Sequence, residues 1–197
     1  YTIMRDFPVI TRSMHIENDG DQSFDLTRAM SACLDLPDKD YEWIQLSGAW
    51  AREREIKTRK LEQGIQSVGS LRGNSSHNHN PFIALKRPSA DEFQGEVIGM
   101  SLVYSGNFLM QAEVDNYDVT RILMGIHPMG FQWHLEPGES FQTPEAIITF
   151  SEGGLNGMSQ TFHKLFRTRL ARGYWRDKER PILINNWEAT YFDFNED

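Results

Sequence analysis

Short strand-like runs separated by turn residues dominate the second half of the sequence. The stretch GEVIGMSLVY is followed by the turn SGN and then by FLMQAEV, which predicts a β-hairpin. Further runs follow at Val119–Ile126 and Ala146–Phe150. In FQWHLEPGESF, the alternation of Phe131, Trp133 and Leu135 puts three large apolar side chains on one face of a strand, which EPGE ends. Many short strands at this spacing predict a β-sandwich.

The first half of the sequence continues this mainly β pattern less regularly. Phe7–Ile16 is read as extended and meets a turn at Glu17–Asp21, and Tyr41–Leu46 is another short strand. The stretch AWAREREIKTRK, Ala49–Lys60, allows two interpretations. It is either a basic helix that holds an anionic partner or a solvated edge strand, because acidic residues interrupt the positive charge.

One segment has helical spacing instead. Met158, Phe162, Leu165 and Leu170 recur at intervals of three to five residues, and Gly173 stands where a C-terminal cap belongs. We therefore predict an amphipathic helix over about 158–172. The hydrophilic stretch YWRDKER that follows is read as a linker.

The last stretch, RPILINNWEATYFDFNED, predicts the opening of a βα unit. Ile182–Ile184 is read as a buried parallel strand, and Asp193 with Glu196 resembles a capping box at a helix start. The carboxylates of this stretch fit a solvated loop better than a general acid and base pair. Trp187 is equally consistent with a substrate contact and with a core position. Because the chain begins with Tyr1 and stops as this unit opens, we expect it to be a piece of a longer polypeptide.

Composition excludes several classes of function. The 20 basic and 28 acidic residues give a net charge of −8, which disfavours nucleic-acid binding through phosphate neutralisation. No apolar run approaches the ~20 residues that a membrane span needs. A single cysteine, Cys33, excludes an intramolecular disulfide framework and suits a reducing compartment, so we expect a cytoplasmic location.

Histidines and glycines give no strong ligand motif. In SSHNHNP, His77 and His79 fall on one face if the segment is extended, which a metal site could use. No third ligand follows at a recognisable spacing, so we expect no metal and a structural or cleft-rim loop instead. Gly153, Gly154 and Gly157 lack the spacing and the lysine of a phosphate-binding loop. No cofactor is implied.

Several stretches together resemble one family. They are GAWARERE, RGNSSHNHNPF, GEVIGMSLVYSGNF, LEPGESFQTPEAIITFSEGG, SQTFHKLFRTRLARG and RPILINNWEATYFDFNE. In this order they resemble the α-galactosidases of glycoside hydrolase family 36, over most of the chain from about Trp50 onward.

The resemblance implies a galactose-mutarotase-like β-supersandwich, incomplete at its start, over residues 1–178, with the helix at about 158–172 as a link. Residues 179–197 then start a (β/α)8 catalytic barrel. Family members use two aspartates on later barrel strands, so no catalytic residue is expected here, and the lysine–tryptophan–aspartate nucleophile motif is absent from the sequence. The segment alone should be inactive.

The resemblance also implies site residues and partners. Trp187 matches a residue that lines the galactose subsite, and Asn186 and Glu188 flank it. Trp50 and the loop Ser75–Pro81, with His77 and His79, are candidates for inter-domain or inter-subunit contacts in a homotetramer. The expected substrate is an α-galactoside oligosaccharide of the melibiose or raffinose type.

Two other functions stay open. A transglycosylase of raffinose-synthase type uses the same retaining chemistry but passes galactose to another sugar. A non-catalytic carbohydrate-binding or oligomerisation module would use exposed aromatic side chains, for which Trp43, Trp50, Trp133 and Trp175 are candidates.

Overall fold

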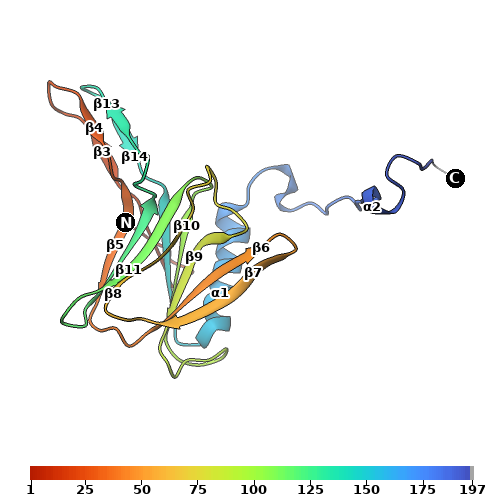
Figure 1. Cartoon of the computed structure of the whole chain (residues 1–197), viewed down its shortest axis with the longest axis horizontal. Helices are drawn as coiled ribbons and strands as arrows, with labels where there is room; N and C mark the ends of the chain where they lie inside the picture. The colour runs from red at the N-terminus through yellow and green to blue at the C-terminus, as the bar shows by residue number, and fades with distance from the viewer. Residues whose placement is uncertain (196–197) are drawn as a thin grey trace. The chain divides into compact units, whose positions relative to one another are not determined.

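The computed structural model describes residues 1–195 (Figure 1). The chain divides into two compact units, one of Tyr1–Phe162 and the other from His163 onward. The strands of the first unit are β1 (Thr2–Ile3), β2 (Val9–Arg12), β3 (His15–Glu17), β4 (Phe24–Leu26), β5 (Met30–Leu36), β6 (Glu42–Ala49), β7 (Arg52–Lys60), β8 (Gly64–Gly69), β9 (His79–Lys86), β10 (Val97–Val103), β11 (Phe108–Val114), β12 (Thr120–Ile126), β13 (Trp133–Leu135), β14 (Ser140–Gln142) and β15 (Glu145–Ser151).

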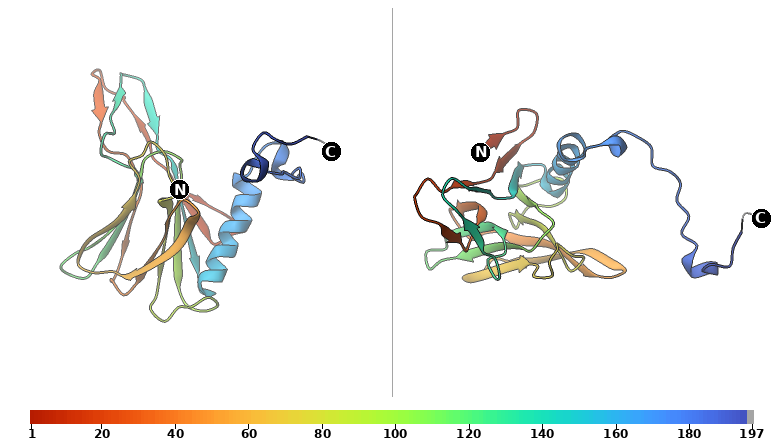
Figure 2. Two further views of the ribbon diagram at one scale, coloured as in Figure 1. Left: turned by 45° about the vertical axis from the view of Figure 1, so that its right-hand side comes forward. Right: turned by 90° about the horizontal axis from the view of Figure 1, so that it is seen from above.

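Two antiparallel sheets form the body of the first unit. Among residues 1–195, one has seven strands in the order β1-β2-β15-β10-β9-β6-β7, and the other has four in the order β5-β12-β11-β8. Two smaller pairs, β13 with β4 and β14 with β3, make an arm that projects from the sheets (Figures 1 and 2). The prediction of a mainly β sandwich is confirmed.

The core lies between the two main sheets. Apolar residues at every second position of the strands point inward, as the two-residue period of a strand requires. The largest fully buried side chains are Trp43, Ile83, Leu85, Met100, Phe108, Met110, Ile122 and Met124. Trp43 is therefore a core residue and is excluded as an exposed sugar platform.

The predicted hairpin between β10 and β11 is wrong. β10 pairs with β9 and β15, whereas β11 pairs with β8 and β12 in the other sheet. Met100 and Phe108 nevertheless belong to the same core cluster. The SGN turn thus carries the chain across the edge of the core from one sheet to the other. A turn between two alternating runs has the same local sequence in either connection, so the local pattern could not distinguish them.

The segment Ala49–Lys60 is an edge strand and not a basic helix. All nine residues of β7 are exposed, and β7 pairs with β6 alone among the described strands. Opposite charges alternate along it, and Lys57 Nζ lies 2.6 Å from Glu55 Oε2. Charged side chains of this kind protect an open sheet edge from pairing with other chains.

Helix α1 (Gly154–Leu165) starts four residues before the predicted position. Within the first unit, its Phe162 packs edge to face on Phe82, with ring centroids 5.7 Å apart. The first turn has no side-chain cap of the usual kind. Instead, Leu155 N–H donates to Asp91 O at 3.0 Å, so a distant loop caps the helix. Helical turns continue as a π-helical segment at Phe166–Leu170, in the second unit.

The second unit contains a 3₁₀ turn (Tyr174–Arg176) and the short helix α2 (Trp187–Thr190). The strand predicted at Ile182–Ile184 is not formed. Its three side chains are exposed, and its backbone pairs with no described strand. A parallel strand is held by hydrogen bonds to neighbouring strands, and no described strand offers them. Glu196, which the predicted capping box pairs with Asp193, lies outside the described residues. No helix within residues 1–195 is both long and apolar enough to cross a membrane.

Candidate functional site

A polar hollow of about 440 Å³ lies where the β6–β7 hairpin meets the loop before β9. Two charged side chains come from β7, and the others come from the loop and the start of β9. The lining residues are Glu53, Arg54, Ser75, Ser76, His77 and Asn80. All of them belong to the first unit.

The hairpin wall of the hollow is shaped by a bulge. The β6–β7 register shifts between Ser47 and Ala49, and a Cβ on Gly48 would lie 2.3 Å from Arg52 O, so only glycine fits there. Ala51 and Arg54 have positive φ angles of 62° and 58°, which are costly for residues with a side chain. This bent tip carries Trp50, whose side chain is 85% exposed. Such strain is found more often at functional sites than elsewhere.

The loop wall is held by hydrogen bonds of its own. Ser76 Oγ accepts from Asn78 N–H at 3.2 Å, and Ser70 Oγ donates to Asn74 O at 2.6 Å. Two contacts attach the loop to the hairpin. Gly48 N–H donates to Asn78 O at 3.1 Å, and Ser47 Oγ lies 2.9 Å from His79 Nδ1.

His77 and His79 do not share one face. The chain turns at His77 and Asn78, so the segment is not extended, which a metal site on one face would require. His77 lines the hollow, whereas His79 starts β9 and bonds Ser47. Within residues 1–195, no group of three or more His, Cys, Asp or Glu side chains is arranged to hold a metal ion.

The neutral form of His79, next to the lining residue Asn80, is favoured. Burial lowers the pKa of His79, and the nearby positive charge of Arg72 lowers it further. Asn80 Oδ1 is buried and accepts no hydrogen bond from the described part of the protein. Glu53 is the one carboxylate among the lining residues, so the hollow lacks the second carboxyl, ~5–5.5 Å away, that a retaining glycosidase requires.

The predicted galactose-subsite residues lie in the second unit and are described separately. Trp187 begins α2, and its backbone N–H donates to Asn185 Oδ1 at 3.1 Å. Its ring packs edge to face on Phe192, with centroids 5.0 Å apart, and is 52% exposed. Asn186 precedes the helix, where its side chain bonds Thr190, and Glu188 is exposed in the first turn. The indole thus keeps an accessible surface.

Sequence reasoning missed several residues of the hollow. Asn80 lies in the Ser75–Pro81 loop, and Glu53 and Arg54 lie in the stretch interpreted as a basic helix or an edge strand, but no individual role was predicted for these three residues. Ser47, which contacts His79 beside the hollow, carried no motif. A weak signal was present in Trp43, Gln45 and Ser47, which alternate on one strand and place polar groups beside a core tryptophan. Their contact with His79 joins residues 32 positions apart, and local spacing does not encode such a contact.

Comparison with known proteins identifies the chain's relatives. The family model described as the glycosyl hydrolase family 36 N-terminal domain matches residues 1–136, and the melibiase model matches residues 140–197. Alpha-galactosidase AgaA of Geobacillus stearothermophilus is 60% identical over all of this chain and 27% of its own length. Alpha-galactosidase Mel36A of Lactobacillus acidophilus is 47% identical over the same shares.

Solved structures agree with these matches. The crystal structure of AgaA superposes with a TM-score of 0.93 and 61% identity, covering 96% of this chain and 26% of that one. The alpha-galactosidase of Lactobacillus brevis gives a TM-score of 0.91 at 47% identity, covering 98% and 26%. The chain therefore spans about a quarter of the length of the relatives it matches.

Proposed function

The chain belongs to glycosyl hydrolase family 36, and from that premise we propose that it is the amino-terminal part of a retaining α-galactosidase. The enzyme removes terminal α-D-galactosyl residues from melibiose- and raffinose-type oligosaccharides. The observation that carries the proposal is 60% identity to an alpha-galactosidase along the whole chain. The structural match over 96% of the chain supports it.

Within this proposal the chain has a supporting role. Residues 1–178 form the β-supersandwich domain, and residues 179–197 begin the catalytic barrel. The melibiase match at residues 140–197 supports a catalytic domain that starts in the last part of the chain. The catalytic aspartates are supplied by the rest of the enzyme, and the segment alone is inactive.

The substrate contacts we propose for this segment are in two places. Trp187 stacks its indole on the apolar face of galactose, with Asn186 and Glu188 supporting the pocket. The hollow, together with Trp50 at the tip of the β6–β7 hairpin, contacts the sugar or a neighbouring subunit of a cytoplasmic homotetramer. The exposed Trp50 and the polar lining of the hollow support this second role.

A second candidate, a non-catalytic sugar-binding module, is favoured by the same hollow. The two functions differ in what the first unit does alone. A tryptophan-fluorescence titration of this chain with melibiose separates them, since a saturable change supports the module and a flat response supports the enzyme segment. Galactose release by the full-length protein tests the enzyme directly.

A further inference from the structure

We propose that Ser47 and His79 are positioning residues that hold the Ser75–Asn80 loop on the β6–β7 hairpin through a neutral imidazole of fixed tautomer. The fixed loop keeps the hollow ready to bind the hydroxyl groups of a sugar ring. The choice of a sugar as the ligand rests on the proposed function. The geometry of the hydrogen bonds does not.

The basis is a chain of hydrogen bonds along the inner face of β6. Trp43 Nε1–H can only donate, and it donates to Gln45 Oε1 at 2.9 Å. Arg59 Nη2 donates to the same oxygen at 3.1 Å. Two donors on one oxygen fix the orientation of the Gln45 amide, so its Nε2 faces Ser47 Oγ at 2.8 Å and donates to it.

The same direction, continued by one bond, gives the tautomer proposed for His79. Ser47 Oγ accepts from Gln45, so its own proton is free to be donated to His79 Nδ1, 2.9 Å away. In the proposed arrangement Ser47 uses that proton, so Nδ1 accepts it and the hydrogen of the neutral ring lies on Nε2. Ser47 is nearly buried, so water competes little for these bonds.

The chain of bonds acts on the hollow through its neighbours in sequence. His79 lies between Asn78, whose carbonyl accepts from Gly48 N–H, and Asn80, which lines the hollow. His77 also lines the hollow, one residue before this double attachment. The buried Asn80 Oδ1 has no hydrogen-bond donor within the described residues.

The first test is the ring ¹⁵N spectrum of His79 in this chain, compared among wild type, Ser47→Ala and Ser47→Thr. We expect an unprotonated Nδ1 and a protonated Nε2 in wild type and in Ser47→Thr, which keeps the hydroxyl donor. In Ser47→Ala the preference should be lost, giving a mixture of tautomers. A protonated Nδ1 in the neutral wild-type ring, or an unchanged spectrum in Ser47→Ala, would overturn the proposal.

The second test uses the full-length enzyme with melibiose. Ser47→Ala should raise KM roughly three- to tenfold, the effect of one lost hydrogen bond, while kcat changes less than about twofold. Ser47→Thr should restore KM. Unchanged KM in Ser47→Ala would contradict the positioning role at the site even if the tautomer is fixed. An inactive wild-type enzyme would contradict the proposed function and leave the spectral test to decide on the tautomer.

Discussion

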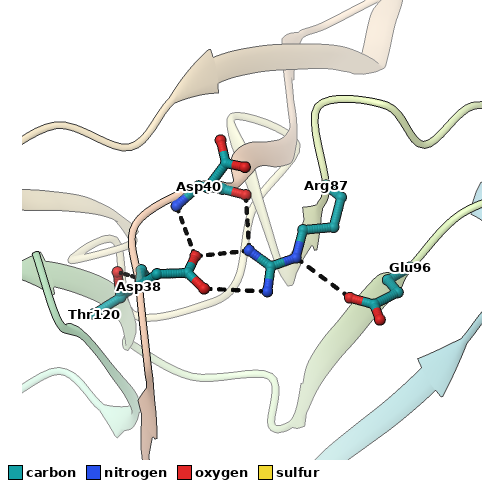
Figure 3. Close-up of polar contacts among 5 residues, drawn as sticks. All are labelled: Asp38, Asp40, Arg87, Glu96 and Thr120. Atoms are coloured by element: carbon teal, nitrogen blue, oxygen red, sulfur yellow. Dashed lines mark hydrogen bonds and ion pairs between the residues drawn. The ribbon is translucent and has the colours of Figure 1, made fainter.

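The guanidinium of Arg87 donates two hydrogen bonds to the carboxylate of Asp38 (Figure 3). Nη1 donates to Oδ1 at 2.6 Å, and Nη2 donates to Oδ2 at 3.2 Å. Arg87 follows β9 of the seven-stranded sheet, and Asp38 follows β5 of the four-stranded sheet. Arg87 Nε also contacts Glu96 at 3.3 Å, and Thr120 Oγ1 donates to Asp38 O at 2.8 Å. One residue thus connects the two layers at one end of the sandwich.

We expect Arg87→Lys to lower the free energy of unfolding by about 1–2 kcal/mol, because a lysine cannot make a bidentate contact with a carboxylate. The value stays small since the Asp38 side chain is 42% exposed and water screens the pair. Urea unfolding of this chain measures it. The matched control is Arg121→Lys, since Arg121 makes the same bidentate contact with Asp35 but within one sheet and fully at the surface. Equal effects of the two substitutions would contradict a special role for the connection between sheets.

The arm should become less stable as pH rises. His134 Nδ1 lies 2.7 Å from Asp25 Oδ1, and Nε2 lies 3.2 Å from Glu136 Oε1. Carboxylates only accept, so both contacts need the protonated ring. The hydrogen bond to Asp25, followed by the one to Glu136, raises the pKa of His134 above its usual value. Lysine and arginine are absent from residues 13–27 and 131–143, so no lysine or arginine of the arm opposes this effect.

Because the folded-state pKa of His134 is raised, its stabilisation is complete below the unfolded value, about 6.5, and is lost as pH rises through the folded value. We therefore expect the wild type to exceed His134→Gln in stability at pH 5.5 and the difference to shrink by pH 8.5. Hydrogen exchange of the β13 amides at the two pH values measures it locally. A difference that grows with pH would contradict the assignment.

Gly154→Ala should destabilise the first unit strongly. Gly154 has a φ of 66°, and a Cβ there would lie 2.4 Å from Asp91 O, in the loop that caps α1. We expect a loss of at least about 2 kcal/mol from clash and backbone strain together. Gly130→Ala is the control, because Gly130 has a φ of 76° but nothing within 4 Å of its Cβ position, and should cost only about 1 kcal/mol. Similar losses in thermal or urea unfolding would show that the contact with the capping loop is unimportant.

Trp187→Ala in the full-length enzyme should lower kcat/KM for melibiose roughly tenfold or more, through lost stacking on the sugar. Trp187→Phe should retain much of the activity because it keeps an aromatic face. Trp175→Ala is a control, since Trp175 is a partly exposed tryptophan of the same unit that is given no role in the galactose subsite of the enzyme. Equal losses in both alanine variants would point to general destabilisation of this unit.

Much of the fold could be predicted from the sequence because alternation of apolar residues is a local property. β11 buries every second residue from Phe108 to Val114, and α1 buries Met158 and Phe162 at helical spacing. Which strands pair was not predictable in this way. The placement of β10 and β11 in different sheets depends on how the side chains of both sheets pack in the core. The start of α1 depends on backbone carbonyls from the Asp91 loop.

In the candidate site, too, local sequence features could be predicted and long-range contacts could not. Trp50 and His77 were both candidate contact residues. His77 lines the hollow, and Trp50 is exposed at the tip of the β6–β7 hairpin. Ser47 gave no signal, because its importance comes from a long-range bond to His79. Ile182–Ile184 shows the opposite case. Its strongly apolar pattern predicts a strand, but a strand forms only with a partner to complete its hydrogen bonds.

The most direct measurement is galactose release from melibiose by two proteins in parallel, this chain and the full-length protein of which we propose it is part. An active full-length protein and an inactive chain would agree with a family 36 α-galactosidase whose catalytic aspartates lie beyond Asp197. A full-length protein that releases no galactose from melibiose or an aryl α-galactoside would contradict the account, and the chain's resemblance to its relatives would then be one of fold alone.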